Sequence, residues 1–288
     1  MSLLNSDKEI LPISLDQSCL VNDGSNNKYT YRFNPSVRFE KASVAIQSIS
    51  MYYSWYNFSA ALYNNTTFTL TFPTAATTQT LSITVPDGFY TINELYQYLQ
   101  SVMIANNLYL TLGGNNVYFF EIITNANAYK VQIDCFLVPT ALGSYSYGAG
   151  GTWGSSGLPT VSRCPQITVA ANGFRDIVGF NAGTYPSTTT AQYSKVSDYT
   201  PQVSPVSAIK VLCSAVQNSY TSPNSFLGAF NVGTSQFGQL IFVSPNEFAF
   251  IKMQDQSLSE ITITFLDQNN RALPINDTSI IISLLIKS

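Results

Sequence analysis

The sequence predicts an all-β protein, a single jelly-roll sandwich with an inserted β-rich lobe that contains one short helix. Apolar and polar residues alternate with a period of two through much of the chain, which is typical of half-buried strands. A length of 288 residues suits one large domain with a second small lobe. No internal repeat of fixed period occurs, so a propeller or a solenoid is disfavoured. Eight to twelve short strands of this kind favour a sandwich of Greek-key or jelly-roll type.

The first predicted strand, at residues 29–33, alternates cleanly and is expected to end at Asn34-Pro35. A long strand follows at 42–52, and residues 68–72 and 81–85 form a predicted hairpin. Further strands are predicted at 108–112, 117–123, 129–138, 167–170, 208–215, 237–243, 248–253, 261–266 and 280–286. Residues 267–271 are expected to form a turn that links the last two of these strands.

One segment, near residues 91–105, predicts a helix instead. Thr91 and Glu94 have the spacing of a capping box, in which each satisfies a backbone N–H of the first turn. Apolar residues then follow at helical spacing: Leu95, Tyr98, Leu99, Val102 and Met103. We expect this helix to pack across the end of a sheet. A second, shorter helical twist is expected between Gly173 and Gly179.

The predicted jelly-roll domain comprises residues 1–60 and 166–288, and the predicted inserted lobe comprises residues 61–165. Within the lobe, residues 139–165 are dominated by Gly, Ser, Thr and Tyr, which predicts a long surface loop with little capacity to form a core. This loop is either a passive excursion or an exposed binding loop.

The chain contains no histidine, and charged residues make up only 10% of it. A Ser-His-Asp or Cys-His pair and a His-ligated metal centre are therefore excluded. A glycosidase needs only two carboxyl groups, so a carboxylate pair remains a hypothesis. The candidates are Asp134, Asp176, Asp198, Asp255, Glu260, Asp267 and Asp277. Because most of them fall at predicted turns and strand ends, the sequence predicts no enzyme, no catalytic, cofactor-binding or metal-binding residue, and no cofactor.

Four widely spaced cysteines, Cys19, Cys135, Cys164 and Cys213, form no paired zinc motif. A large core does not need disulfides, so we expect buried free thiols. A net charge of −3 argues against a sequence-independent hold on nucleic acid. The basic stretch Lys28, Arg32, Arg38 and Lys41 is an exception. It fits either a solvated sheet edge or a contact with an acidic polymer or a partner subunit.

No signal peptide is expected at residues 1–16, and no apolar stretch has the length of a membrane span. Aromatic residues are abundant, at 13%, and four of them gather at Tyr52, Tyr53, Trp55 and Tyr56. Strand alternation places about half of these in a core and half on the opposite face. The excess of aromatic residues over what a core needs favours a large protein–protein contact, since Tyr and Trp supply contact area at low entropic cost.

Several fragments, in one order along nearly the whole chain, resemble the minor capsid (penton) proteins of virophages and polinton-type viruses. They are Ile-Ser-Met-Tyr-Tyr-Ser-Trp-Tyr-Asn at 49–57, Asp-Gly-Phe-Tyr at 87–90 before Asn-Glu-Leu at 93–95, Val-Gly-Phe at 178–180 with Gly-Thr-Tyr-Pro at 183–186, Ile-Lys-Val-Leu-Cys at 209–213 before Asn218, and Ile-Thr-Phe-Leu-Asp-Gln-Asn at 263–269 with Leu-Pro-Ile at 273–275. The segment 139–165 has no counterpart among these fragments.

The resemblance implies a structural protein of the virion that forms homopentamers at the five-fold vertices of an icosahedral capsid. The neighbours of each pentamer would be hexameric or trimeric capsomers of the major capsid protein, with a host receptor as a further partner. An alternative is a receptor- or carbohydrate-binding jelly-roll module, using aromatic residues at 52–56 or between Tyr145 and Trp153.

Overall fold

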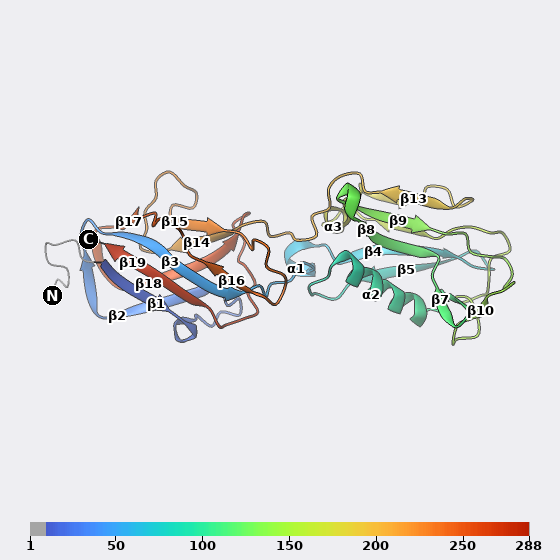
Figure 1. The fold of residues 1–288 in the computed structure, drawn as a ribbon, viewed down its shortest axis with the longest axis horizontal. Helices are drawn as coiled ribbons and strands as arrows, with labels where there is room; N and C mark the ends of the chain where they lie inside the picture. The colour runs from blue at the N-terminus through green and yellow to red at the C-terminus, as the bar shows by residue number, and fades with distance from the viewer. Residues whose placement is uncertain (1–9, 288) are drawn as a thin grey trace. The chain divides into compact units, whose positions relative to one another are not determined.

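The computed structural model describes residues 10–287, which fold into two compact units (Figure 1). Unit 1 comprises residues 10–55 and 206–287 of this range, and unit 2 comprises residues 56–205. Both are built mainly of antiparallel strands, which confirms the prediction of an all-β fold. Residues 1–9 and 288 of the predicted jelly-roll domain lie outside the described residues.

Unit 1 is a sandwich of two sheets. Its strands are β1 (Ile10–Leu15), β2 (Lys28–Phe39), β3 (Ser43–Tyr52), β14 (Ile209–Cys213), β15 (Phe226–Phe230), β16 (Leu240–Val243), β17 (Ile251–Lys252), β18 (Gln256–Asp267) and β19 (Ile281–Lys287), with a 3-10 turn at Gln17–Cys19 after β1. One sheet has the order β1-β19-β3-β16, with β17 also paired to β3, and the other has the order β15-β14-β18-β2. Its first strand pairs with its last and its second with the last but one, which is the strand order of a jelly roll.

Alternation along the strands fills the space between these two sheets. In the first sheet, Ile282 of β19 lies opposite both Leu15 and Ile49, and all three side chains are fully buried. In the second, Val211 lies opposite Phe265, and both are fully buried. The predicted wall strands at 29–33, 42–52 and 208–215 therefore belong to unit 1.

The prediction that the first wall strand ends at Asn34-Pro35 is wrong. Strand β2 continues to Phe39 and pairs with β18 through residues 28–32 and again through residues 37–39. The register of this pair shifts between Leu258 and Glu260, opposite the stretch that contains Pro35. A bulge and an edge position are two of the settings in which a strand tolerates proline, which cannot donate to the ladder, and β2 has both.

The turn at 267–271 is present, but it does not join the last two strands into a hairpin. The N–H of Asn270 donates to the carbonyl of Asp267 at 3.1 Å, and the chain returns only to a bridge between Leu266 and Ala272. Strands β18 and β19 lie in opposite sheets. The sequence reading also missed β1 and β15, because Pro12 and Gly228 interrupt their patterns.

Unit 2 contains three sheets and three short α-helices among the described residues. The sheets have the orders β12-β11-β4-β5, β13-β9-β8 and β10-β6-β7. The strands are β4 (Thr67–Pro73), β5 (Thr78–Thr84), β6 (Leu110–Leu112), β7 (Asn115–Val117), β8 (Phe120–Asn125), β9 (Lys130–Cys135), β10 (Ser146–Tyr147), β11 (Gln166–Val169), β12 (Gly183–Tyr185) and β13 (Tyr193–Val196), and the helices are α1 (Ala60–Tyr63), α2 (Ile92–Ala105) and α3 (Phe174–Val178), with a 3-10 turn at Ala126–Ala128.

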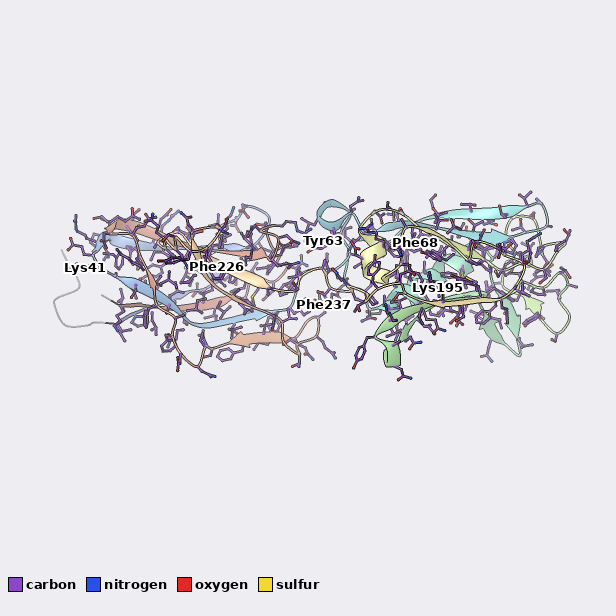
Figure 2. The ribbon with its side chains drawn as sticks, turned by 90° about the horizontal axis from the view of Figure 1, so that it is seen from above. Lys41, Tyr63, Phe68, Lys195, Phe226 and Phe237 are labelled. Atoms are coloured by element: carbon purple, nitrogen blue, oxygen red, sulfur yellow. The ribbon has the colours of Figure 1, made fainter. Side chains whose placement is uncertain are left out.

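The division between the units differs from the predicted one. Residues 166–205, which were assigned to the jelly roll, lie in unit 2. The reason is strand pairing: β11 adds to β4, and β13 adds to β9. Phe68 of β4 (labelled in Figure 2) also stacks on Phe174 of α3, with ring centroids 4.1 Å apart.

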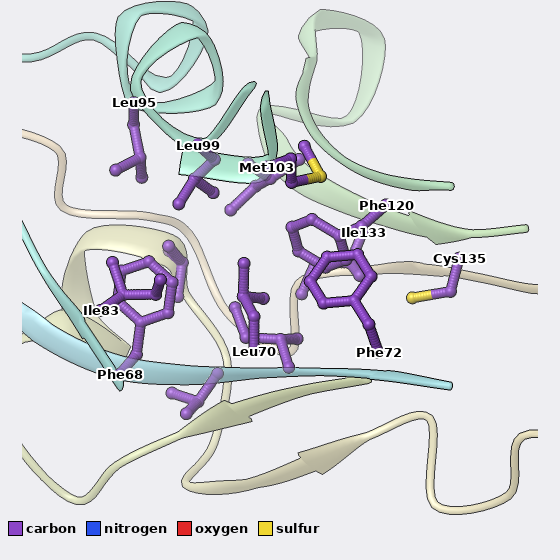
Figure 3. Packing of buried hydrophobic residues seen from close by; sticks show 14 of the residues in the cluster. Phe68, Leu70, Phe72, Ile83, Leu95, Leu99, Met103, Phe120, Ile133 and Cys135 are labelled. Atoms are coloured by element: carbon purple, nitrogen blue, oxygen red, sulfur yellow. The ribbon is translucent and has the colours of Figure 1, made fainter. Parts of the chain in front are cut away.

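The predicted helix is α2, and its predicted cap is confirmed. The hydroxyl of Thr91 accepts the N–H of Glu94 at 3.2 Å, and the carboxylate of Glu94 accepts the N–H of Thr91 at 2.7 Å. Leu95, Leu99 and Met103 form the buried stripe. Figure 3 shows these three side chains facing the core of unit 2, which Phe120 and other residues of the strands complete.

The prediction that residues 139–165 form a surface loop with little capacity for a core is wrong at Trp153. This side chain is fully buried in the core of unit 2. Its indole N–H donates to the carbonyl of Pro73 at 2.8 Å, and its ring lies edge-on to Phe119 at 5.5 Å between centroids. Trp153 is thus the largest of the side chains that fix this segment, which has no long strand of its own, to the core of unit 2.

Candidate assembly surface

The described residues contain no group of three or more His, Cys, Asp or Glu side chains that could hold a metal ion. Within residues 10–287, no helix is both long and apolar enough to cross a membrane. Cys135, Cys164 and Cys213 are buried free thiols, as predicted, whereas Cys19 is partly exposed. Burial raises the pKa of Cys213 to about 11, so this thiol stays protonated and is a poor nucleophile at neutral pH.

The carboxylates proposed for a glycosidase pair each have partners close by. Asp267 accepts Arg271 Nε at 2.7 Å and the N–H of Asn269 at 2.8 Å, which makes it the centre of a turn. Glu260 pairs with Arg32 at 3.6 Å. The others follow the same pattern: Asp198 with Lys195 at 2.7 Å, Asp176 with Arg175 at 3.4 Å, Asp255 with the N–H of Lys41 at 2.7 Å, and Asp277 with the N–H of Ser279 at 3.0 Å.

Asp198 illustrates how these carboxylates are used. Burial acts to raise the pKa of Asp198, but the N–H of Asn181 and the ammonium of Lys195 outweigh it and hold that pKa below its ordinary value. Lys195 (Figure 2) also lies over the ring of Tyr185, 4.6 Å from its centroid. Through this ion pair and this cation–π contact, Lys195 of β13 is linked to Asp198 and to Tyr185 of β12.

Asp134 differs, because the structure places a second carboxylate, Glu121, directly opposite it in the β8–β9 pair. Both oxygens of Asp134 accept the side-chain amide of Gln132, at 3.0 and 2.9 Å. Burial raises the pKa of Glu121 above its ordinary value, a hydrogen bond from Tyr96 of α2 opposes this, and the charge of Asp134 adds to it. Glu121 is not among the carboxylates predicted as candidates from the sequence, although the predicted hairpin that turns at 125–127 sets this register.

We expect Glu121 to contribute more to the stability of unit 2 in mild acid than at neutral pH. Since the folded pKa of Glu121 lies above its unfolded value, the stabilisation is complete below the unfolded value and is lost as the pH rises through the raised folded pKa. Glu121→Gln removes this loss, so it should raise the urea midpoint of unit 2 at pH 7 and leave it nearly unchanged at pH 4. Glu247→Gln, at an exposed site of unit 1, is the control. An equal effect of Glu121→Gln at both pH values would contradict the prediction.

The aromatic run at 52–56 alternates as predicted. Tyr53 and Trp55 are buried in unit 1, and Tyr52 and Tyr56 are exposed. Of the aromatic residues considered for carbohydrate stacking, Trp55 and Trp153 are therefore enclosed by protein. Substituting Trp153 would test the fold rather than the binding of a sugar.

The basic stretch lies on β2 and just beyond it, at the edge of one jelly-roll sheet. Three of its four side chains have acidic partners: Lys28 contacts Asp23 at 2.7 Å, Arg32 contacts Glu260, and Arg38 contacts Glu40 at 2.6 Å. The charges and the bulge are the features by which natural sheets protect an edge from unwanted pairing. The structure thus favours the solvated-edge interpretation of this stretch.

The other sheet ends in an edge of opposite character. Its outermost strand, β16, has the sequence Leu-Ile-Phe-Val and carries no charge. Leu240 lies opposite Tyr52, and Phe242 lies opposite Ser50, which in turn faces Ile281. Opposed residues of an antiparallel pair share one face of the sheet. Four apolar side chains therefore lie on the same face: Tyr52, Leu240, Phe242 and Ile281.

We call Tyr52, Leu240, Phe242 and Ile281 the apolar edge patch. Their side chains are on the solvent face and are 43%, 50%, 65% and 51% exposed, respectively. Neighbouring positions on that face are the hydroxyl residues Ser48, Ser50 and Ser283. Contiguous exposed apolar surface of this kind typically marks a contact with another protein, and an uncharged edge strand adds unpaired backbone groups.

A groove with a volume of about 520 Å³ runs beside β16. It is lined by Phe230 of β15, by Ile241, Phe242 and Val243 of β16, and by the connecting residues 231–235. Phe242 therefore belongs to both the patch and the wall of the groove. Together they form a continuous surface along one side of the jelly roll, in which the patch is apolar, the groove is partly polar, and neither carries a charged side chain.

No protein-family model matches the chain, and no curated protein matches it. Among solved structures, the chain is similar to the crystal structure of the mavirus penton protein, with 11% identity, a TM-score of 0.47, and coverage of 98% of this chain and 100% of that one. It is also similar to a cryo-EM structure of the Sputnik virophage, with 10% identity, a TM-score of 0.44 and 98% coverage of both chains.

Proposed function

We propose that this protein is a structural subunit of a viral capsid, located in the virion, and that five copies of it form the capsomer at each five-fold vertex. The observation that carries the proposal is the apolar edge patch, since a surface of this kind needs a covering partner. The chemical inventory supports it: the sequence has no histidine, and the carboxylates are engaged in turns and ion pairs.

A five-fold ring closes through heterologous contacts, in which each subunit presents two different surfaces to its two neighbours. The uncharged edge at β16, with its groove, offers one of these two surfaces. Major capsid protein capsomers would then surround the ring, with no role for nucleic acid or for a membrane span.

Native mass spectrometry and multi-angle light scattering of the purified full chain test this proposal. The expected result is a species of five times the monomer mass of 31.6 kDa, either in isolation or on mixing with the major capsid protein. A stable dimer or trimer under all conditions, with no pentamer on mixing, would contradict it.

A further inference from the structure

Three side-chain polar atoms in unit 1 are buried without a hydrogen-bond partner in the protein: the hydroxyl of Tyr29, the indole Nε1 of Trp55 and Oδ2 of Asp277. Tyr29 is fully buried and Trp55 is 1% exposed. Native proteins pair nearly all such atoms, because a buried polar group without a partner loses its hydration and gains nothing in return. Each of the three atoms therefore requires a partner that is not a protein group.

The chain brings these residues to one end of the sandwich. Ser54 Oγ accepts the N–H of Asn276 at 3.2 Å and the N–H of Asp277 at 3.0 Å, so Asp277 lies beside the residue that precedes Trp55. Two residues earlier, the N–H of Ile275 donates to the carbonyl of Ser25 at 3.2 Å, close to the start of β2. The segment 275–277 is thus hydrogen-bonded to both the end of β3 and the approach to β2.

The negative charge of Asp277 also acts on the Tyr29 hydroxyl. Burial first, and then the negative charge of Asp277, raise the pKa of Tyr29 to about 12. The phenol therefore keeps its proton at neutral pH and remains a donor. Tyr29 is on the inner face of one sheet, where its ring lies edge-on to Phe265 at 6.3 Å between centroids.

The three atoms are chemically complementary to one kind of ligand. The Tyr29 hydroxyl and the Trp55 indole offer protons, and the Asp277 carboxylate offers only lone pairs. A cation would be repelled by the positive end of the indole N–H, and an anion would be repelled by the carboxylate. A water molecule accepts two hydrogen bonds and donates two, which matches two donors and one acceptor.

We propose that unit 1 holds one structural water molecule that accepts hydrogen bonds from Tyr29 and Trp55 and donates one to Asp277 Oδ2. Tyr29 begins β2 in one sheet, Trp55 follows β3 in the other, and Asp277 precedes β19. The water would therefore link the two sheets of the jelly roll through a polar contact inside an apolar core. Such a link fixes the approach of three strands without a direct side-chain bond.

A crystal structure of the full chain at high resolution tests the site directly. The expected result is an ordered water about 2.7–3.1 Å from all three atoms. A direct hydrogen bond between Tyr29 and Asp277 with no water between them, or the pairing of Trp55 Nε1 with another protein atom, would overturn the proposal.

Thermal unfolding of Tyr29→Phe, Trp55→Phe and the double variant tests it independently. If one water serves both donors, the second substitution lowers the Tm by less than it does alone, because the first has already disturbed the shared water. The double variant should therefore lose less in Tm than the sum of the two single losses. Tyr29→Phe combined with Tyr199→Phe, whose hydroxyl contacts Asp176 in unit 2, is the matched control and should be additive. Additive losses in the Tyr29 and Trp55 pair would overturn the shared water.

Discussion

Trp153→Ala is expected to lower the free energy of unfolding of unit 2 by ~3–5 kcal/mol, the range found when a large buried aromatic side chain is deleted. The loss has two parts. The indole leaves a cavity between Phe119 and Phe72, whose ring centroids lie 5.5 and 6.4 Å away, and the carbonyl of Pro73 loses its donor. For a unit of this size, the midpoint of thermal unfolding should fall by roughly 2–4 °C per kcal/mol.

Urea unfolding measures this loss of free energy. Limited proteolysis at each urea concentration, with the cut sites mapped, assigns the loss to unit 2. Val161→Ala is the matched control, because Val161 lies in the same segment but is 59% exposed. It should change the free energy of unfolding by no more than about 0.5 kcal/mol. Trp153→Phe keeps most of the apolar volume and should fall between the two. If Trp153→Ala were as mild as Val161→Ala, the segment 139–165 would not depend on this residue for its place.

Phe242→Asp is expected to weaken assembly roughly 30-fold or more per subunit contact, equivalent to about 2 kcal/mol, while the monomer stays folded. On the solvent face of β16 the carboxylate remains hydrated in the monomer, so the jelly roll loses little. In an assembled contact the same charge would be buried without a partner, which is the costlier state. Analytical ultracentrifugation over a range of concentrations measures the difference, with circular dichroism as the check on folding.

Tyr220→Asp provides the matched control for assembly. Tyr220 is also an aromatic residue of unit 1 and is 98% exposed, but it lies in the connection between β14 and β15, outside the apolar edge patch. Its substitution should leave the assembled mass unchanged. If Phe242→Asp and Leu240→Asp both assembled like the unsubstituted protein, the apolar edge patch would not be the subunit contact.

The elements that the sequence predicted correctly are those whose signal is local. The capping box at Thr91, the stripe from Leu95 to Met103 and the hairpin within 68–85 each depend on residues a few positions apart, and all three are present. The alternation of buried and exposed aromatic residues at 52–56 follows from the same local rule.

The features that the sequence reading missed depend on pairing between distant segments. Residues 166–205 resemble wall strands in pattern, and only the pairing of β11 with β4 and of β13 with β9 assigns them to unit 2. The Gly- and Ser-rich composition of 139–165 obscured one tryptophan that reaches the core. For β16, the pattern predicted a strand, but the exposure of its outer face depends on what other segments leave uncovered.

The strand order of unit 1 also constrains the order of events during synthesis. Ile10 of β1 lies opposite Lys287 of β19, and β3 is separated from β14 by the whole of unit 2. Pairings between such remote segments close slowly, because the ordering of a long chain precedes the contacts that reward it. Unit 2 is continuous in the chain and can form while the partners of β1, β2 and β3 are still on the ribosome. The edges of β1, β2 and β3 therefore stay unpaired during this interval, and unpaired strand edges are a general cause of aggregation in incompletely folded chains.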